Sequence, residues 1–189
     1  MYNIVMTKYI LHGGNAQKPC AENDIFFGEI LKSYTSNPKI LLVHFAGKPE
    51  KAIINKERDT NQFNRIKENK DLKFEIANEI SFVKQIKKND IIYLGGGTTV
   101  KILESLRKFH GLKKLFEGKV VAGESAGANA LSTYCYSKSG GGIIQSLGIL
   151  PVNVVPHYEK SLNKVFDSLN DSNLEKVFLP EYKFRIFEV

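Results

Sequence analysis

The chain has 189 residues, of which 42% are hydrophobic and 25% are charged, and its formal net charge is +7 at pH 7. These values favour one globular domain that can bury its own core, so we expect a single α/β hydrolase-type domain over residues 1–189. No apolar stretch approaches the ~20 residues of a membrane helix. The first eight residues also lack the pattern of a signal peptide, and we therefore expect a cytoplasmic protein with no membrane partner.

Short apolar runs alternate with longer amphipathic segments along the chain. We expect strands in six places: residues 9–11, 40–43, 72–76, 90–94, 119–122 and 152–156. Apolar residues at helical spacing predict helices between them: residues 25–31, 52–69, 80–86, 100–109 and 126–131. Cys135 is expected to lie at the end of the last helix.

The alternation of apolar strands with helices indicates the fold class. Strands that are apolar on both faces are typical of a parallel sheet covered on both sides. We therefore predict a doubly wound, mainly parallel α/β sheet with helices on both faces. In such sheets the active site lies beyond the carboxyl ends of the strands, which is where the glycine-rich turns of this sequence fall.

The positive charge is spread along the chain and does not form one basic stripe. Over residues 56–71, lysines and arginines alternate with acidic residues, as on a solvated helix face. The interleaved aromatic residues of a nucleic-acid-binding surface are missing, so we expect no nucleic-acid partner. A positive field can still attract small acidic substrates.

One motif carries most of the chemical signal. The segment Gly123–Gly127 fits G-x-S-x-G, with an apolar strand before it and a small-residue helix after it. This context is typical of a nucleophile elbow, which holds a serine exposed on a sharp strand-to-helix turn. We therefore predict that Ser125 is a nucleophile. The backbone N–H of Ala126, at the start of the helix, is expected to be the first oxyanion donor.

A serine nucleophile needs a base, and the chain offers four histidines. His110 lies in a polar helix end. His12 and His44 follow early strands and could line the rim of the site. His157 follows the strand predicted over residues 152–156, and its position after the serine suits a base on a neighbouring loop.

A second glycine-rich segment follows the strand predicted over residues 90–94. The run Gly95-Gly96-Gly97 precedes a predicted helix, but it matches neither the dinucleotide-binding pattern nor the P-loop. Its remaining use is to supply the second oxyanion donor, from Gly96 or a neighbour.

Three motifs together resemble the dipeptidase E family of serine peptidases, which includes aspartyl dipeptidase and cyanophycinase. They are Tyr93–Thr99, Gly123–Ala128, and Leu147–Pro151 leading to Pro156–Tyr158. The resemblance covers about residues 8–181 and implies a fold similar to class I glutamine amidotransferases. It further implies a small peptide substrate and His157 as the base, with neither a metal nor an organic cofactor. We expect a monomer or a homodimer.

The third member of the catalytic triad does not follow from the resemblance. Aspartyl dipeptidases carry an Asp about fifteen residues after the serine, where this chain has serines, glycines and a lysine. The remaining candidates are Glu159, Glu124 and Glu181. We favour Glu159, because His157-x-Glu159 is similar to the His-x-Glu arrangement of the glutamine amidotransferases.

The substrate specificity also depends on the resemblance. The dipeptidases recognise an acidic P1 residue through basic side chains beyond the histidine, and Lys160 and Lys164 occupy that stretch here. The sequence thus predicts a serine peptidase that hydrolyses short peptides through an acyl-enzyme at Ser125. Two alternatives remain open. One is a non-catalytic or regulatory small-ligand-binding member of the same fold, and the other is an acyl hydrolase with a non-peptide substrate.

Overall fold

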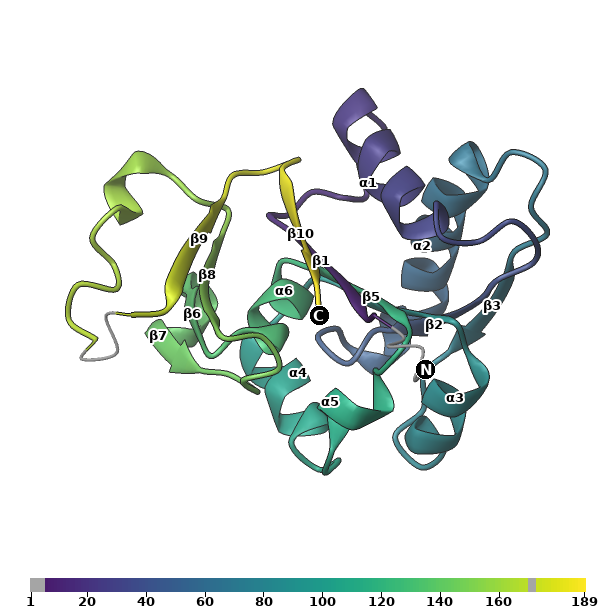
Figure 1. Cartoon of the computed structure of the whole chain (residues 1–189). Helices are drawn as coiled ribbons and strands as arrows, with labels where there is room; N and C mark the ends of the chain where they lie inside the picture. Colours follow the sequence, from purple (N-terminus) through teal and green to yellow (C-terminus); the bar gives the residue numbers. More distant parts are fainter. Residues whose placement is uncertain (1–5, 170–172) are drawn as a thin grey trace, which may run out of the picture.

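The computed structural model describes residues 6–169 and 173–189 and contains two β-sheets (Figure 1). The strands of the larger sheet are β1 (Lys8–His12), β2 (Lys39–Val43), β3 (Lys73–Ile76), β4 (Ile91–Leu94), β5 (Val120–Glu124) and β10 (Phe184–Glu188). Those of the smaller sheet are β6 (Tyr134–Ser137), β7 (Gly142–Gln145), β8 (Val152–Pro156) and β9 (Glu175–Leu179). The strand orders are β10-β1-β5-β4-β2-β3 and β7-β6-β8-β9. Pairing is parallel except for β10 with β1 and β7 with β6.

Helices cover both faces of the larger sheet (Figure 1). They are α1 (Ala21–Leu31), α2 (Ala52–Ile66), α3 (Phe82–Lys88), α4 (Thr99–Leu106), α5 (Leu112–Leu115) and α6 (Ala126–Leu131). Three short 3-10 turns complete the described elements: η1 (Pro49–Lys51), η2 (Lys138–Gly140) and η3 (Lys160–Leu162). Aromatic and aliphatic side chains of α1 and α2 pack on one face, and those of α3 to α6 pack on the other. The predicted fold class is therefore confirmed. None of the helices in the described ranges is long and apolar enough to cross a membrane.

The inner strands β2 and β4 are almost wholly apolar because each buries both of its faces. In β4, Ile91 and Tyr93 join the core under α1 and α2, whereas Ile92 and Leu94 join the core under α3 to α6. Successive side chains of a strand point to opposite faces, so a strand covered on both sides needs an apolar residue at every position.

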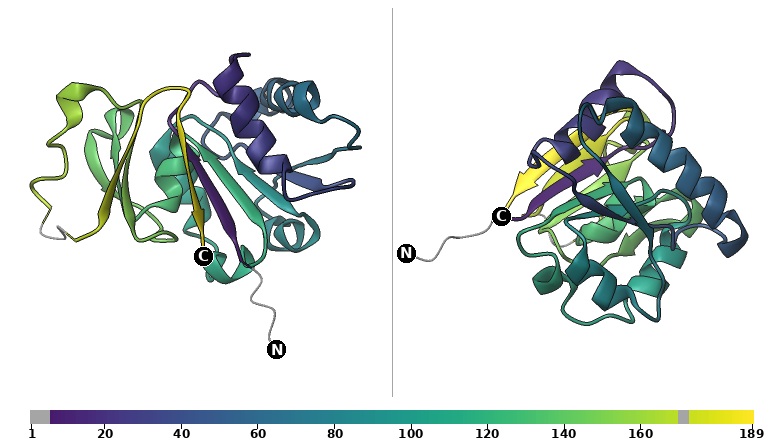
Figure 2. Two further views of the ribbon diagram at one scale, coloured as in Figure 1. Left: turned by 45° about the horizontal axis from the view of Figure 1, so that its top comes forward. Right: turned by 90° about the vertical axis from the view of Figure 1, so that its right-hand side faces the viewer.

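The smaller sheet was not expected from the sequence. Cys135, predicted at the end of a helix, lies in β6, where buried and half-buried residues alternate. Burial raises the pKa of the Cys135 thiol to about 11. The left view of Figure 2 shows this sheet at one end of the molecule, with α1 and α2 at the other. Its β8 and β9 contribute Val152, Val154, Val177 and Leu179 to the same core cluster as the larger sheet.

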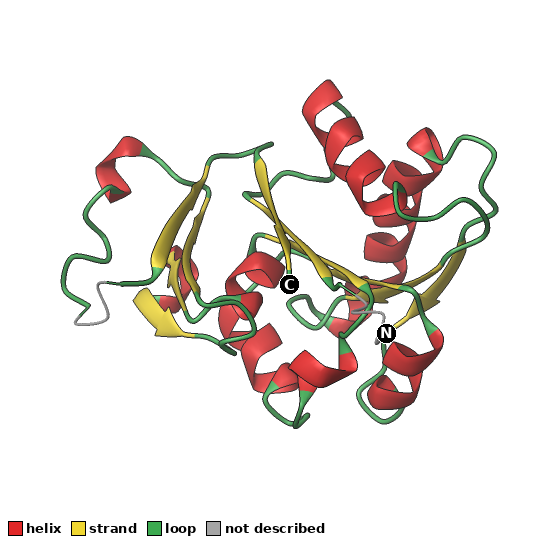
Figure 3. Ribbon diagram, in the orientation of Figure 1, coloured by secondary structure: helices red, strands yellow, loops and turns green. Residues whose placement is uncertain are grey.

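Two features of the topology position the site. First, β1, β5 and β4 are parallel neighbours, so the loops that follow them emerge side by side at one edge of the sheet. Second, β8 and β9 are parallel, with Pro156 opposite Leu179, so the chain leaves both strands at one edge of the smaller sheet. Figure 3 shows loop and one short helical turn in the described residues between β8 and β9. Lys160 lies in the short 3-10 turn η3, and Lys164 follows it in the loop.

Candidate active site

Ser125 occupies a sharp turn between β5 and α6. Its backbone adopts φ 50° and ψ −103°, an uncommon conformation for a residue with a side chain. Its N–H donates a hydrogen bond to the carbonyl of His12 (2.9 Å), which fixes the turn to β1. Gly127 allows α6 to approach β4 closely, since a Cβ at that position would lie 2.1 Å from the carbonyl oxygen of Leu94. This geometry is that of a nucleophile elbow.

The imidazole of His157 contacts the hydroxyl of Ser125. The distance between Ser125 Oγ and His157 Nε2 is 2.9 Å. The His157 backbone has φ 49°, and its N–H donates to the carbonyl of Gly13 (2.8 Å). The ring packs against Gly14, where a Cβ would lie 2.1 Å from Cε1. The loop after β1 thus holds the histidine in place.

A carboxylate lies on the other side of the imidazole. Glu181 Oε1 is 3.2 Å from His157 Nδ1, and both side chains are about half exposed. An ionised carboxylate only accepts hydrogen bonds, so this contact places the ring proton on Nδ1. Nε2 is then free to accept the hydroxyl proton of Ser125, which is the arrangement a serine hydrolase needs.

Glu159, the acid that we favoured from the sequence, does not occupy this position. It is exposed and precedes η3, and within the described residues no hydrogen bond joins it to His157. The positive φ of His157 turns the chain after β8, while the register of β8 with β9 brings Glu181 to the ring. The sequence kept Glu181 as an alternative, but it held no signal for this pairing of strands.

The oxyanion donors differ partly from expectation. The N–H of Gly96 donates to the buried carboxylate of Glu124 (3.2 Å) and is therefore occupied. Its neighbour Gly97 lines the cavity beside Ser125, and Ala126 begins α6. Among the described residues, no hydrogen-bond partner is found for the N–H of Gly97 or Ala126. These two groups are the candidate donors.

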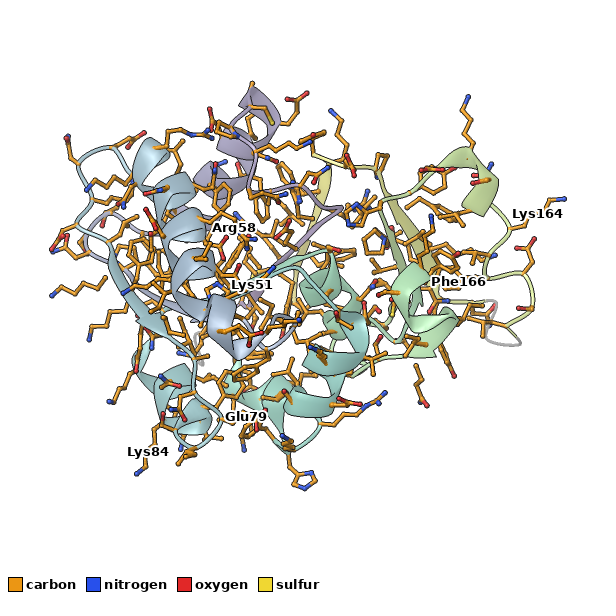
Figure 4. All side chains as sticks on the ribbon, turned by 180° about the vertical axis from the view of Figure 1, so that it is seen from behind. Lys51, Arg58, Glu79, Lys84, Lys164 and Phe166 are labelled. Carbon is orange, nitrogen blue, oxygen red and sulfur yellow. The ribbon has the colours of Figure 1, made fainter. Side chains whose placement is uncertain are left out.

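A cavity of about 620 Å³ opens at Ser125 and His157. Polar side chains from α4, α6 and the β6–β7 hairpin line much of it: Thr99, Asn129, Tyr136, Ser137, Lys138 and Ser139. Glu159, Ser161 and Leu162 line it from the loop after β8. Lys160 and Lys164 are not among the lining residues, and Figure 4 shows Lys164 pointing outward. Lys138 was missed because its hairpin was not predicted.

The other histidines do not line this cavity. His110 is exposed, and His44 Nε2 lies 2.8 Å from Asp59 Oδ2 beneath the loop after β4. His12 is buried, with Nε2 3.0 Å from Asn23 Oδ1, and its Nδ1 accepts a hydrogen bond from the N–H of Gly14 (3.1 Å). His12 therefore supports the loop on which His157 rests. No group of three or more side chains that could hold a metal ion occurs within the described ranges.

We expect His12 to make the stability of the protein depend on pH. Burial lowers the pKa of His12 to about 4, against 6.5 for an ordinary histidine; Asn23 opposes this shift, and His157 adds slightly to it. The unfolded chain therefore takes up a proton first as pH falls. The free energy of unfolding should decrease by roughly 3 kcal/mol between pH 6.5 and pH 4. Urea denaturation across this range should show a shallower dependence for His12→Gln, and an unchanged dependence would contradict the assignment.

The comparisons with known proteins agree with this geometry. The model of peptidase family S51 matches residues 10–179. The chain belongs to peptidase family S51. The resemblance to the dipeptidase E family is thereby confirmed, and the S51 chain is a serine-type peptidase.

Two solved structures are similar to nearly the whole of this chain. A peptidase from an acI-B1 Actinobacterium shares 21% identity at a TM-score of 0.68, covering 98% of this chain and 85% of its own. A candidate peptidase E protein from Listeria monocytogenes EGD-e shares 17% identity at a TM-score of 0.65, covering 97% and 98%. At these identities the likeness concerns the fold. No curated protein matches the sequence significantly.

Proposed function

We propose that this S51 peptidase hydrolyses short peptides through an acyl-enzyme on Ser125. His157 acts as the general base and Glu181 orients it. The observation that carries the proposal is the continuous contact from Ser125 Oγ to His157 Nε2 (2.9 Å) and from His157 Nδ1 to Glu181 Oε1 (3.2 Å). Family membership alone supports a serine peptidase, and these contacts support the roles that we propose for the three side chains.

The chemistry follows from these contacts. Ser125 Oγ attacks the peptide carbonyl carbon while its proton passes to His157 Nε2, and the carbonyl oxygen becomes an oxyanion near the N–H groups of Ala126 and Gly97. The carbon–nitrogen bond then breaks, and the proton on Nε2 goes to the leaving amine. A water molecule then gives a proton to the same nitrogen and adds to the ester carbonyl carbon. The bond from this carbon to Ser125 Oγ breaks, and the proton on Nε2 returns to Oγ.

The dimensions of the cavity favour short substrates. Its volume, about 620 Å³, lies within the ~300–1,000 Å³ typical of sites that enclose small ligands. Its lining places one ammonium group (Lys138) and one carboxylate (Glu159) near the nucleophile. A short peptide, which carries both kinds of charge at its termini, matches this lining better than a neutral ester does.

Covalent labelling tests the proposal directly. A fluorophosphonate should react with the purified protein and raise its intact mass by that of one bound label, because only an activated serine reacts readily. Peptide mapping should locate the label on Ser125. A panel of dipeptides, longer peptides and simple esters then defines the substrate. Failure of the wild-type protein to react would favour the non-catalytic ligand-binding alternative.

We expect Lys138, and not Lys160, to bind an acidic group of the substrate. Both lysines are exposed, but only Lys138 lines the cavity, and none of the ion pairs found among the described residues involves it. An exposed ion pair contributes up to about 1 kcal/mol, so the kcat/KM preference for Asp over Asn at P1 should fall about fivefold in Lys138→Met. Lys160→Met is the matched control and should keep the wild-type preference. Equal effects in both variants would contradict the assignment.

A further inference from the structure

Glu124 precedes the nucleophile but does not touch it or the imidazole of His157. Its side chain is buried, with the residue only 5% exposed. Oε1 accepts a hydrogen bond from the N–H of Ala16 (3.1 Å), and Oε2 accepts one from the N–H of Gly96 (3.2 Å). One carboxylate therefore joins the loop after β1 to the loop after β4, beneath the turn that carries Ser125.

The first of these loops, residues 13–16, holds the segments that carry the proposed base and the proposed acid. The carbonyl of Gly13 accepts the backbone N–H of His157 (2.8 Å). The carbonyl of Gly14 accepts the N–H of Tyr182, the residue after the proposed acid (3.1 Å). A shift of this loop would therefore move the base and the acid together.

The second loop carries one of the two proposed oxyanion donors, the N–H of Gly97. Gly96 is fixed by its hydrogen bond to Glu124, and the next residue, Gly97, lines the cavity. The Gly97 backbone has φ 144°, and its neighbour Thr98 donates from its N–H to the carbonyl of Ala46 (2.9 Å). The direction of the Gly97 N–H thus depends on the hydrogen bonds of its two neighbours in the chain. Glu124 accepts the one from Gly96.

The surroundings of Glu124 explain why this position needs a carboxylate. Burial and, to a lesser degree, the nearby charge of Asp59 raise the pKa of Glu124, while Arg58 on α2 (Figure 4) and the two backbone N–H groups lower it. Arg58 Nε also donates to Asp59 Oδ1 (2.8 Å), and Asp59 contacts His44. The buried phenol of Tyr93 lies beside the same charges. The two N–H donors reach different oxygen atoms of one side chain, and only a carboxylate side chain has two acceptor oxygens.

We propose that Glu124 is a positioning residue of the active site, which sets the oxyanion donor and the base by clamping the loops that carry them. The inference deepens the proposed function and rests on it. Glu124 takes no part in proton transfer. It acts through Gly96 on the donor at Gly97, and through Ala16 on the loop that holds His157 and Glu181.

The test is Glu124→Gln, which keeps the size of the side chain but replaces one acceptor oxygen with an NH₂ donor. One clamp bond is then lost, and kcat should fall roughly 10- to 100-fold, less than the ~10²–10³ that loss of a whole oxyanion donor costs. KM should change less than about threefold. A peptide aldehyde, whose adduct with Ser125 places an oxygen in the oxyanion position, should lose its advantage over the matching alcohol by the same factor as kcat.

Asp59→Asn is the matched control, because it removes a buried charge from the same cluster without touching either clamped N–H. It should lower the melting temperature but keep the wild-type aldehyde-to-alcohol ratio. The same loss of ratio in both variants, or a wild-type ratio in a folded Glu124→Gln protein, would overturn the inference. Fluorophosphonate labelling of Ser125 in the wild-type protein tests the proposed function separately. If the label attaches while the ratio test fails, the clamp is overturned and the proposed function stands.

A measurement on the wild-type protein covers the case in which Glu124→Gln does not fold. The amide proton resonances of Ala16 and Gly96 should move together, with one shared midpoint, as Glu124 is protonated. Burial raises the pKa of Glu124, so this midpoint should lie above that of an ordinary glutamate. Independent or absent titration of the two resonances would overturn the clamp.

Discussion

Ser125→Ala should reduce peptide hydrolysis by about 10⁶ in kcat, the loss observed when the nucleophile of a serine hydrolase is removed. The hydroxyl is the only atom removed, and the elbow backbone is held independently by the hydrogen bond from the Ser125 N–H to the His12 carbonyl (2.9 Å). The fold should therefore persist. The loss of kcat is measured with the best dipeptide of the panel. Thermal unfolding of the wild-type protein and the variant shows whether the fold persists.

Two controls make this result specific. Ser139 also lines the cavity, is exposed, and lies away from the elbow on η2. Ser139→Ala should therefore hydrolyse peptide at nearly the wild-type rate and retain fluorophosphonate labelling, whereas Ser125→Ala should lose both. Activity of Ser125→Ala within tenfold of wild type would exclude the serine as the nucleophile.

Glu181→Gln should lower kcat by roughly 10²–10⁴, as expected for the acid of a catalytic triad. The physical reason is the tautomer of His157. A glutamine can donate from its NH₂ group to Nδ1, which would move the ring proton to Nε2 and remove the acceptor for the hydroxyl of Ser125. The fluorophosphonate labelling rate should fall in parallel, because the same proton transfer activates the serine.

Glu159→Gln is the matched control for this prediction. Glu159 lies two residues after His157 in the sequence, but only Glu181 contacts the imidazole ring. Glu159→Gln should keep kcat within a few-fold of wild type, whereas the reverse order of the two effects would restore Glu159 as the orienting acid. ¹⁵N resonances of the His157 ring, which distinguish the two neutral tautomers, provide a readout that does not depend on turnover.

The charges of the cavity and of the whole chain bear on the choice of substrate. Lys138 and Glu159 place opposite charges in one cavity, and the chain carries a formal net charge of +7. We expect the positive field to favour the approach of acidic peptides, and the two charged groups to select their orientation. A preference for Asp at P1 that depends on Lys138 but not on Lys160 would show that the cavity recognises acidic peptides.

The sequence by itself determined the parts of the protein that local pattern encodes. Apolar strands such as Ile91–Leu94 predicted a sheet buried on both faces, since a strand covered on both sides is apolar at each position. The elbow around Ser125 was visible because its glycines and its strand-to-helix context are local. His157 was chosen because the motifs around it resemble those of one family, which the match over residues 10–179 supports.

Only the tertiary structure decided which distant residues meet. Glu181 reaches His157 because β8 pairs with β9 in parallel register, with Pro156 opposite Leu179, and no spacing along the chain encodes that pairing. Lys138 enters the cavity through a hairpin that short alternating runs did not reveal. Glu124 was one of the three candidate triad acids, but its carboxylate bonds to backbone N–H groups and not to His157. Its two bonds to Ala16 and Gly96 exist because β1, β5 and β4 lie side by side, which brings three loops from separate parts of the chain to one edge of the sheet.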